Sequence, residues 1–330
     1  MAVVKADAYG HGAVACAQAL SPLVDAFAVA IMEEAIALRE AGIELPILVL
    51  QGPNSLEDAQ VIAESALWPA ISSEHQINWL EQSGARVEQI WIKCDTGMHR
   101  LGFMPDDVAL AKQRLAVLST KDTVLMSHFA DAEAPDSPLT ERQLSRWNEL
   151  TASSKDTSFS NSAATTGQIS ARENWIRLGY SLYGGSLVTL PEPCRLKPVM
   201  CFESCIASVR SIESGESVGY GGRWVANRPS RIATIPAGYG DGYPRAARDG
   251  TPIGSEHGVI PMVGKVSMDM VTADITDIPE LDVGSPVTLW GGTPTIDTVA
   301  AYCDTIGYEL CTRITRRAPR QFHPDTGHQD

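Results

Sequence analysis

One lysine near the start of the chain stands where a reactive amine could be expected. Lys5 ends the apolar run Ala2–Val4 and precedes the segment Gly10-His11-Gly12. Partial burial at the end of a strand lowers the pKa of a lysine and leaves its free amine able to attack a carbonyl carbon. The glycines allow backbone amides to approach an anion such as a phosphate. On spacing alone, a structural lysine at a strand end is the more common interpretation, so a reactive Lys5 needs support from other residues.

Charged or polar side chains end four later apolar runs as well. Lys93, His128 and Ser162 end or closely follow three of them, and Arg177 lies on the last. Taken singly, a histidine is more often a satisfied core residue, and an arginine is more often half of a salt bridge. Their recurrence at the same end of successive strands, together with Lys5, indicates one shared site.

The runs that carry these residues alternate with amphipathic segments over the first 185 residues. Glu33–Ala41 is followed by Gly42, Ser55 opens a segment in capping-box style, and Ser73–Gln82 ends before Gly84, while Thr140–Leu150 is a further amphipathic helix. Alternating strands and helices predict a parallel sheet, and eight units favour an α/β fold with a closed (β/α)8 TIM-like barrel. The predicted strands are Ala2–Lys5, Phe27–Ala30, Ile47–Leu50, Trp68–Ile71, Ile90–Lys93, Val124–His128, Ser158–Ser162 and Trp175–Tyr183.

The pattern changes after about Pro191. Short strand-like segments follow one another, separated by Gly, Pro, Asp and Asn turns, with one helix near Ile296–Tyr302. We therefore predict a barrel over residues 1–190 and a mainly β C-terminal domain over residues 191–330. The predicted strands of this second domain are Ile206–Ile212, Arg231–Ile235, Val259–Val263, Val266–Ile275 and Pro286–Trp290.

The composition excludes several classes of partner. The chain has 330 residues, of which 44% are hydrophobic, and a net charge of −14, which argues against nucleic-acid binding. No apolar run approaches the ~18 residues of a membrane span, and the residues before Lys5 do not have the pattern of a secretory signal, so we expect neither feature. The seven scattered cysteines form no C-x-x-C pair, which predicts reduced thiols, no metal site and a cytoplasmic protein.

Longer blocks of the sequence resemble one family over essentially the whole chain. The K-A-D-A-Y-G-H-G block around Lys5 is a strong signature of the alanine racemases, which are fold-type III enzymes that use pyridoxal 5'-phosphate (PLP). It is followed in order by K-C-D-T-G-M-H-R-L-G, S-H-F, S-N-S-A, R-L-G-Y-S-L-Y-G, V-G-Y-G-G, G-Y-G-D-G-Y-P-R and V-G-K-V-S-M-D-M. The resemblance implies interconversion of L- and D-alanine, with D-alanine supplied for peptidoglycan. It also implies a barrel followed by a β domain, and a homodimer whose active sites draw on both chains.

The resemblance also implies the residues that act in catalysis and hold the cofactor. Lys5 matches the lysine that binds PLP covalently and serves as one base, and Tyr220 matches the second base, supplied by the partner subunit. Without the resemblance, Tyr220 would be an ordinary turn tyrosine. Arg177 matches the arginine that faces the pyridine nitrogen, and His128 the histidine that links it to the tyrosine base. The phosphate-binding groups are matched by Tyr9, Ser162, Gly179 and Tyr180.

The substrate-binding residues come from the same comparison of blocks. Arg100 and the backbone amide of Met268 match the contacts to the substrate carboxylate, with Asp269 beside them. Tyr239 resembles a residue that borders the substrate entrance. Lys93 matches a lysine that is often carbamylated, which would turn a cation into a carboxylate that orients Arg100.

Two features depart from the family pattern. Most members have about one strand and one helix before the lysine strand, whereas Met1 stands four residues ahead of Lys5, so the resemblance implies an N-terminally shortened barrel. Arg316 stands where some members have a phosphate-binding tyrosine, and that contact is not carried over.

Other activities of the same fold remain as alternatives. One is a racemase of broad specificity, or one for serine or lysine, which pocket volume near Tyr239 and Met268 would distinguish. A decarboxylase typically has a glutamate in place of Arg177. A non-catalytic PLP-binding barrel protein shares the lysine strand but lacks the β domain.

Overall fold

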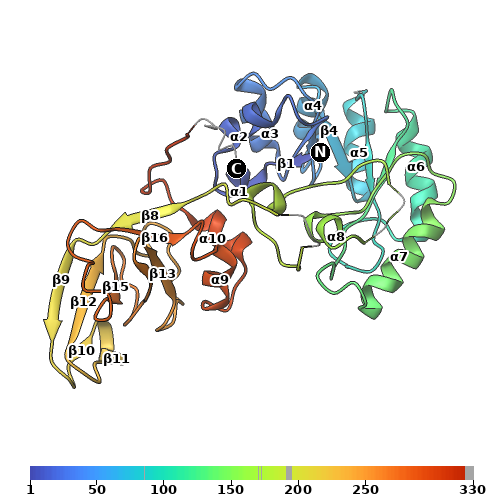
Figure 1. Cartoon of the computed structure of the whole chain (residues 1–330). Helices are drawn as coiled ribbons and strands as arrows, with labels where there is room; N and C mark the ends of the chain where they lie inside the picture. The colour runs from blue at the N-terminus through green and yellow to red at the C-terminus, as the bar shows by residue number, and fades with distance from the viewer. Residues whose placement is uncertain (85, 170, 172, 191–194, 324–330) are drawn as a thin grey trace. The chain divides into compact units, whose positions relative to one another are not determined.

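The computed structural model describes residues 1–84, 86–169, 171, 173–190 and 195–323. The chain divides into two compact units, Met1–Lys197 and Pro198–Asp330 (Figure 1). The predicted domain boundary between residues 190 and 191 borders a segment, 191–194, that lies outside the described residues, and it stays a prediction.

The first unit is built on seven short parallel strands that pair in chain order. Their side chains are almost all buried, as expected where both faces of a parallel sheet are covered. The carboxyl ends of such strands meet on one face, and this brings the residues that follow them together. The strands are β1 (Ala2–Val3), β2 (Phe27–Val29), β3 (Ile47–Val49), β4 (Trp68–Ile71), β5 (Trp91–Lys93), β6 (Val124–Met126) and β7 (Thr157–Ser158).

The eighth predicted strand is only partly regular, yet it closes the barrel. The Trp175 amide donates to the carbonyl of Thr157 in β7 (3.1 Å), and the amide of Val3 in β1 donates to the Leu178 carbonyl (2.7 Å). The segment 175–178 therefore bridges the first and last strands. The rest of the prediction was wrong: Tyr180–Tyr183 is a 3-10 helix, η2, which ends at Gly184 in the left-handed region (φ 87°).

Helices follow most of the strands. The predicted helices are confirmed as α3 (Met32–Glu40), α4 (Leu56–Glu64), α5 (Glu74–Ser83) and α7 (Pro138–Thr151), and α4, α5 and α6 pack in order (Figure 1). Ser55 caps α4 by accepting from the Asp58 amide (3.1 Å), and Gly84 ends α5 in the left-handed region. The helices that were not predicted are α2 (Ala13–Leu20), α6 (Val108–Ala116) and α8 (Ser162–Thr166). The short segment α1 (Lys5–Tyr9) was not predicted either, and most of its residues have positive φ.

The second unit is mainly β, as predicted. A three-stranded antiparallel sheet has the order β15-β12-β9, a four-stranded sheet has the order β14-β13-β16-β8, and β10 pairs with β11. Tyr243, Trp290 and Leu289 are among the buried residues of its core. The strands and helices are β8 (Phe202–Cys205), β9 (Ser208–Ile212), β10 (Ser217–Val218), β11 (Trp224–Val225), β12 (Ser230–Ile235), β13 (Pro252–Ser255), β14 (Gly258–Pro261), β15 (Val271–Asp274), β16 (Pro286–Trp290), α9 (Ile296–Ala301) and α10 (Gly307–Arg313).

One strand prediction in this unit was too long. Only Val271–Asp274 of the predicted strand Val266–Ile275 is regular. The preceding residues form a tight loop in which Ser267 and Met270 bond to each other: the Ser267 amide donates to the Met270 carbonyl (3.0 Å), and the Met270 amide donates to Ser267 Oγ (3.0 Å). This loop carries Met268 and Asp269.

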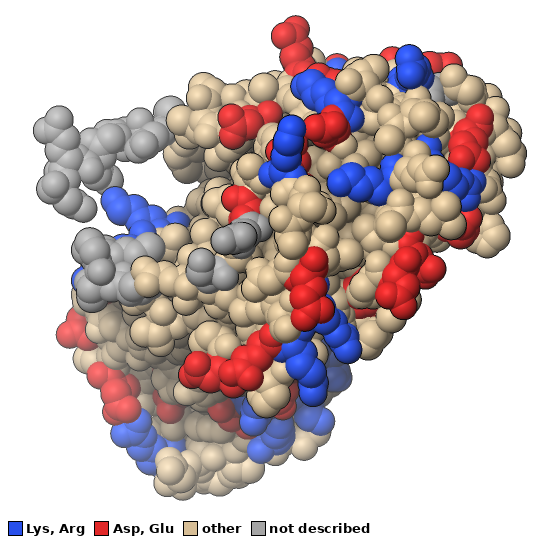
Figure 2. All heavy atoms as spheres, turned by 90° about the vertical axis from the view of Figure 1, so that its right-hand side faces the viewer, with Lys and Arg blue, Asp and Glu red and all other residues tan. Residues whose placement is uncertain are grey.

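The surface carries both signs of charge. On the face drawn in Figure 2, basic and acidic side chains are interspersed. None of the helices within the described ranges combines the length and the hydrophobicity that a membrane span requires.

Candidate active site

Lys5 is followed by a turn of unusual backbone. The four residues Ala6–Tyr9 all lie in the left-handed region, with φ between 52° and 55°. Such conformations cost roughly 1–2 kcal/mol per residue, and they persist only where the surroundings enforce them. The carboxylate of Glu34 on α3 accepts from the Ala6 amide (2.6 Å) and from the Ala30 amide after β2 (2.7 Å), so it ties this turn to the neighbouring strand.

Cationic side chains gather around the lysine. Burial lowers the pKa of Lys5, and Arg100 and Arg177 lower it further, while Glu34 opposes them. Burial, followed by Arg177, Arg100 and Lys5, lowers the pKa of Lys93 to about 7. Cations that follow β1, that lie on or follow β5, and that lie on the closing segment 175–178 are therefore close enough to repel one another. Such a cluster fits an anionic ligand.

Arg177 is held firmly inside the barrel. Its side chain is only 5% exposed, and it donates to Ser158 Oγ and to the Ser127 carbonyl. Its Nη2 lies 3.4 Å from His128 Nδ1. Burial and the charge of Arg177 lower the pKa of His128 well below its ordinary value, so the imidazole is neutral and accepts from the guanidinium. The predicted pairing of Arg177 with His128 is present.

The predicted phosphate-binding residues also lie together. Ser162 Oγ, at the start of α8, accepts from the amides of Gly179 (2.9 Å) and Ser181 (3.3 Å). A Cβ on Gly179 would lie 2.5 Å from Tyr9 Oη, so a larger residue at this position would have to displace the Tyr9 side chain. Tyr180 follows and is buried. Hydroxyls and amides that converge beside a cationic cluster are a donor set that fits the phosphate group of PLP.

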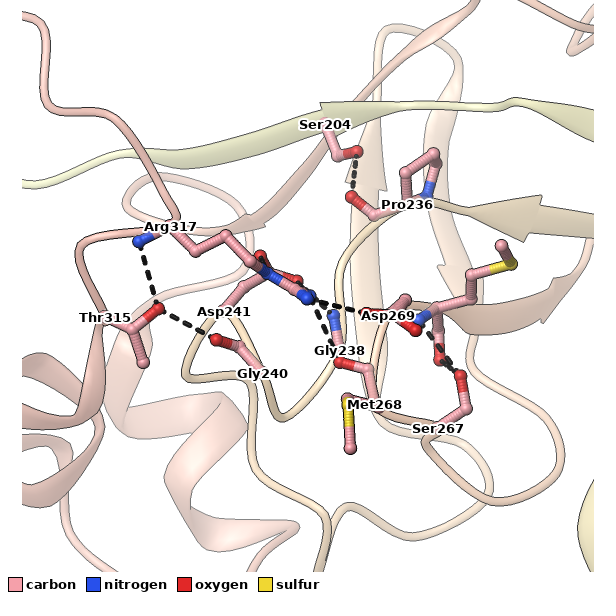
Figure 3. A network of polar contacts seen from close by, with 11 residues as sticks. Ser204, Pro236, Gly238, Gly240, Asp241, Ser267, Met268, Asp269, Thr315 and Arg317 are labelled. Carbon is pink, nitrogen blue, oxygen red and sulfur yellow. Dashed lines mark hydrogen bonds and ion pairs between the residues drawn. The ribbon is translucent and has the colours of Figure 1, made fainter.

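The remaining predicted residues belong to the second unit. Tyr220 begins the short helix η3 (Tyr220–Gly222) and is 68% exposed, and Met268 is 53% exposed. The Tyr239 amide donates to the Ser267 carbonyl (3.1 Å). The loop of Gly238 and Gly240 lies against the loop that carries Met268 and Asp269 (Figure 3). The roles of Tyr220, Tyr239, Met268 and Asp269 beside Lys5 stay predictions.

Three residues that bind the segments carrying the proposed site residues were not predicted. Glu34 ties the turn after Lys5, and Arg317 binds both Asp241 and Asp269 in the second unit. Gln143 on α7 is fully buried, with Oε1 accepting from the Ala130 amide (2.9 Å) and Nε2 donating to the His128 carbonyl (2.9 Å). Their positions on helices or after the last helix give only amphipathic spacing, and no local pattern identifies their partners.

Comparisons with known proteins agree over the whole chain. Residues 1–187 match the model of the alanine racemase N-terminal domain, and residues 199–322 match that of the alanine racemase C-terminal domain. The alanine racemase of Chromohalobacter salexigens is 48% identical over 99% of this chain and 92% of its own length. The corresponding protein of Xanthomonas campestris pv. campestris is 44% identical over 98% of this chain and 91% of its own.

Solved structures give the same result. The biosynthetic alanine racemase from Pseudomonas aeruginosa has a TM-score of 0.93 and 39% identity, covering 98% of this chain and 92% of that one. The alanine racemase from Acinetobacter baumannii has a TM-score of 0.89 and 35% identity, covering 97% and 91%. The fold, the buried cationic cluster and these comparisons together assign the chain to the alanine racemase family of PLP-dependent isomerases.

Proposed function

We propose that this protein interconverts L-alanine and D-alanine with two bases, Lys5 and Tyr220 of the partner subunit, and supplies D-alanine for peptidoglycan. The observation that carries the proposal is the environment of Lys5. Burial and two nearby arginines lower the pKa of its amine, which favours the uncharged form that can bind the cofactor and accept a proton.

The residues gathered at the barrel mouth suit PLP. Lys5 would bind it covalently, while Tyr9, Ser162 and the amides of Gly179 and Tyr180 would hold its phosphate. When bound, PLP stabilises the negative charge that remains after the Cα proton of the amino acid is removed. Arg177 would face the pyridine nitrogen. Burial lowers its pKa to about 10, so it stays protonated at neutral pH and donates to that nitrogen.

Each of the two bases would transfer a proton at one face of the substrate Cα. Lys5 accepts or returns a proton on one face, and the phenolic oxygen of Tyr220 of the partner subunit does so on the other. A tyrosine hydroxyl ordinarily has a pKa of about 10, so it is a weak base at neutral pH. A nearby positive charge favours the phenolate, which is the form that accepts a proton. Arg177, held against the neutral His128, would supply that charge.

The substrate carboxylate needs its own donors. Arg100 is exposed at the barrel mouth and would bind it together with the backbone amide of Met268 of the partner subunit. Within the described part of the chain, the Met268 amide donates no hydrogen bond of its own, which supports this role. Tyr239 and Asp269 would border the entrance.

Lys93 would act on Arg100 through a modification. Since its pKa is about 7, much of its amine is uncharged at neutral pH, the form that reacts with carbon dioxide. Carbamylation would replace a Lys93–Arg100 repulsion by an attraction, and the resulting carboxylate would orient Arg100.

The same reasoning favours a homodimer in the cytoplasm. Exposure of Tyr220 and Met268 supports a second chain that covers them. The cysteines in the described part of the chain, which leaves out Cys194, are free thiols, as expected in a reducing compartment.

The decisive experiment follows the conversion of L-alanine by the purified protein with added PLP. We expect D-alanine to accumulate to an equal mixture, with serine and lysine converted far more slowly. Comparable rates on serine or lysine would favour the racemase of other specificity. PLP binding without turnover of any amino acid would favour the non-catalytic barrel protein and contradict the proposal.

A further inference from the structure

One arginine of the second unit joins three separate segments. Arg317 follows α10, and its Nε and Nη2 donate to the two carboxylate oxygens of Asp241 (2.7 and 2.8 Å). Its Nη1 donates to Asp269 Oδ1 (2.6 Å), and Nη2 also reaches the Met268 carbonyl (3.3 Å). Figure 3 shows the guanidinium between the two acidic side chains. The planar fork of an arginine suits this bidentate geometry, which a lysine cannot reproduce.

Backbone contacts make the arrangement of these segments tight. Asp241 Oδ2 accepts from the Gly238 amide (2.8 Å), and the Gly240 amide donates to the Met268 carbonyl (2.8 Å). A Cβ on Gly238 would lie only 2.3 Å from that carbonyl oxygen. The loop that carries Tyr239 therefore packs directly on the backbone of Met268, and Arg317 holds both from one side.

The contacts suit positioning better than general stability. The Arg317 side chain is 46% exposed and that of Asp269 is 57% exposed. An ion pair as open to water as Arg317–Asp269 contributes little to the free energy of unfolding, whereas the pair with Asp241, whose side chain is 16% exposed, is better shielded. Arg317 fixes the Met268 carbonyl and the Asp269 side chain, and the Tyr239 amide holds the Ser267 carbonyl (3.1 Å), so the backbone is held on both sides of the Met268 amide.

We infer that Arg317 is a positioning residue that sets the Met268 amide and the Tyr239 loop for binding of the substrate carboxylate. The inference rests on the proposed function, in which that amide is a substrate donor. Loss of the arginine would leave Asp241 and Asp269 without their shared cation, and only backbone hydrogen bonds, such as that from the Gly240 amide to the Met268 carbonyl, would then hold the two loops together. The affinity for the carboxylate should fall more than the rate of the chemical step.

The test compares Arg317→Ala, Arg317→Lys and Asp241→Asn in the full-length holoenzyme. A displaced donor loop should raise the KM for alanine on the order of tenfold or more in Arg317→Ala, with a smaller change in kcat. Arg317→Lys should recover part of the loss, because a lysine can engage one carboxylate, and Asp241→Asn should fall between. Arg228→Ala is the matched control, since it removes an exposed arginine–aspartate pair (Arg228–Asp277, 2.6 Å) from the same unit and should leave KM unchanged.

A second measurement separates this inference from the proposed function. Amide hydrogen exchange of peptides covering residues 238–242 and 265–270 should accelerate in Arg317→Ala but not in Arg228→Ala. Unchanged exchange, or an unchanged KM in an active variant, would overturn the inference. A wild-type protein that does not racemise alanine would overturn the proposed function and the substrate role of Arg317, while the exchange data would still decide whether Arg317 holds the loops.

Discussion

The two units present their proposed site residues in opposite ways. In the first unit, Arg177 is 5% exposed and the amines of Lys5 and Lys93 have lowered pKa values because they are buried among like charges. In the second unit, Tyr220 and Met268 are 68% and 53% exposed, although their loops have well-defined backbone contacts. The first unit has buried cations whose charge an anionic ligand would balance. The second unit has exposed groups, which another molecule would have to contact before they could act.

Among the buried residues of the barrel, we expect Lys5 to have the largest effect on activity when it is replaced. Lys5→Ala loses both the covalent attachment and one base, so we expect racemisation to fall at least on the order of 10³-fold, measured as D-alanine formed from L-alanine. Lys155→Ala is the control, because Lys155 is an exposed lysine of the same unit. Activity within tenfold of wild type in Lys5→Ala would refute the role of Lys5, and a comparable loss in Lys155→Ala would show that the effect is not specific.

The exposed side of the comparison is tested by Tyr220→Phe. We expect a loss on the order of 10²–10⁴-fold in racemisation, because one face of the substrate lacks its base. Lys5 can still remove and return a proton on its own face. In D₂O, the variant should therefore exchange the Cα hydrogen of one enantiomer much faster than it forms the other. Equal exchange into both enantiomers would contradict the division between two bases.

Mixed dimers of Lys5→Ala and Tyr220→Phe test which chain supplies Tyr220 to each active site. If each site combines Lys5 of one chain with Tyr220 of its partner, co-expression of Lys5→Ala and Tyr220→Phe should restore about a quarter of wild-type activity, since half of the dimers are mixed and each has one intact site. Each variant expressed alone serves as the control. No recovery in a protein shown to form mixed dimers would mean that both bases act within one chain.

Local patterns predicted much of this arrangement, and long-range contacts account for what they missed. The alternation of strands and helices and the caps at Ser55 and Gly84 are written in neighbouring residues, so the barrel was predictable. The left-handed turn at Ala6–Tyr9 was not, because alanine and tyrosine rarely adopt positive φ and a single aspartate gives only a weak local signal for it. That turn depends on Glu34, 28 residues from Ala6, and on packing that no short window contains.

The same limit applies to the site residues. Lys5, His128 and Arg177 were found because each lies at or near the end of a strand, where the fold itself gathers side chains. The link from Arg317 to Asp241 spans 76 positions, and neither residue stands in a pattern that pairs it with the other. The eighth strand was overextended because the apolar run continues through Tyr180–Tyr183, while Gly179 and Gly184 allow the backbone to turn.

The charge of Lys93 affects the stability of the barrel rather than the rate of a chemical step. Its pKa is about 7 in the folded protein and 10.5 ordinarily, so the unfolded chain binds more protons between these values. The free energy of unfolding of the unmodified protein should therefore rise as the pH increases through this window, by at most about 1.4 kcal/mol per pH unit, and level off below pH 7. The difference between wild type and Lys93→Met, measured by denaturant unfolding in buffer free of carbon dioxide, isolates this slope.

Bicarbonate should weaken the slope in wild type only, because a carbamylated Lys93 no longer titrates as an amine. A slope that is identical in the variant would mean that Lys93 is not part of the cationic cluster, and the contrast between a charged barrel and an uncharged set of exposed donors would then rest on Lys5 and Arg177 alone.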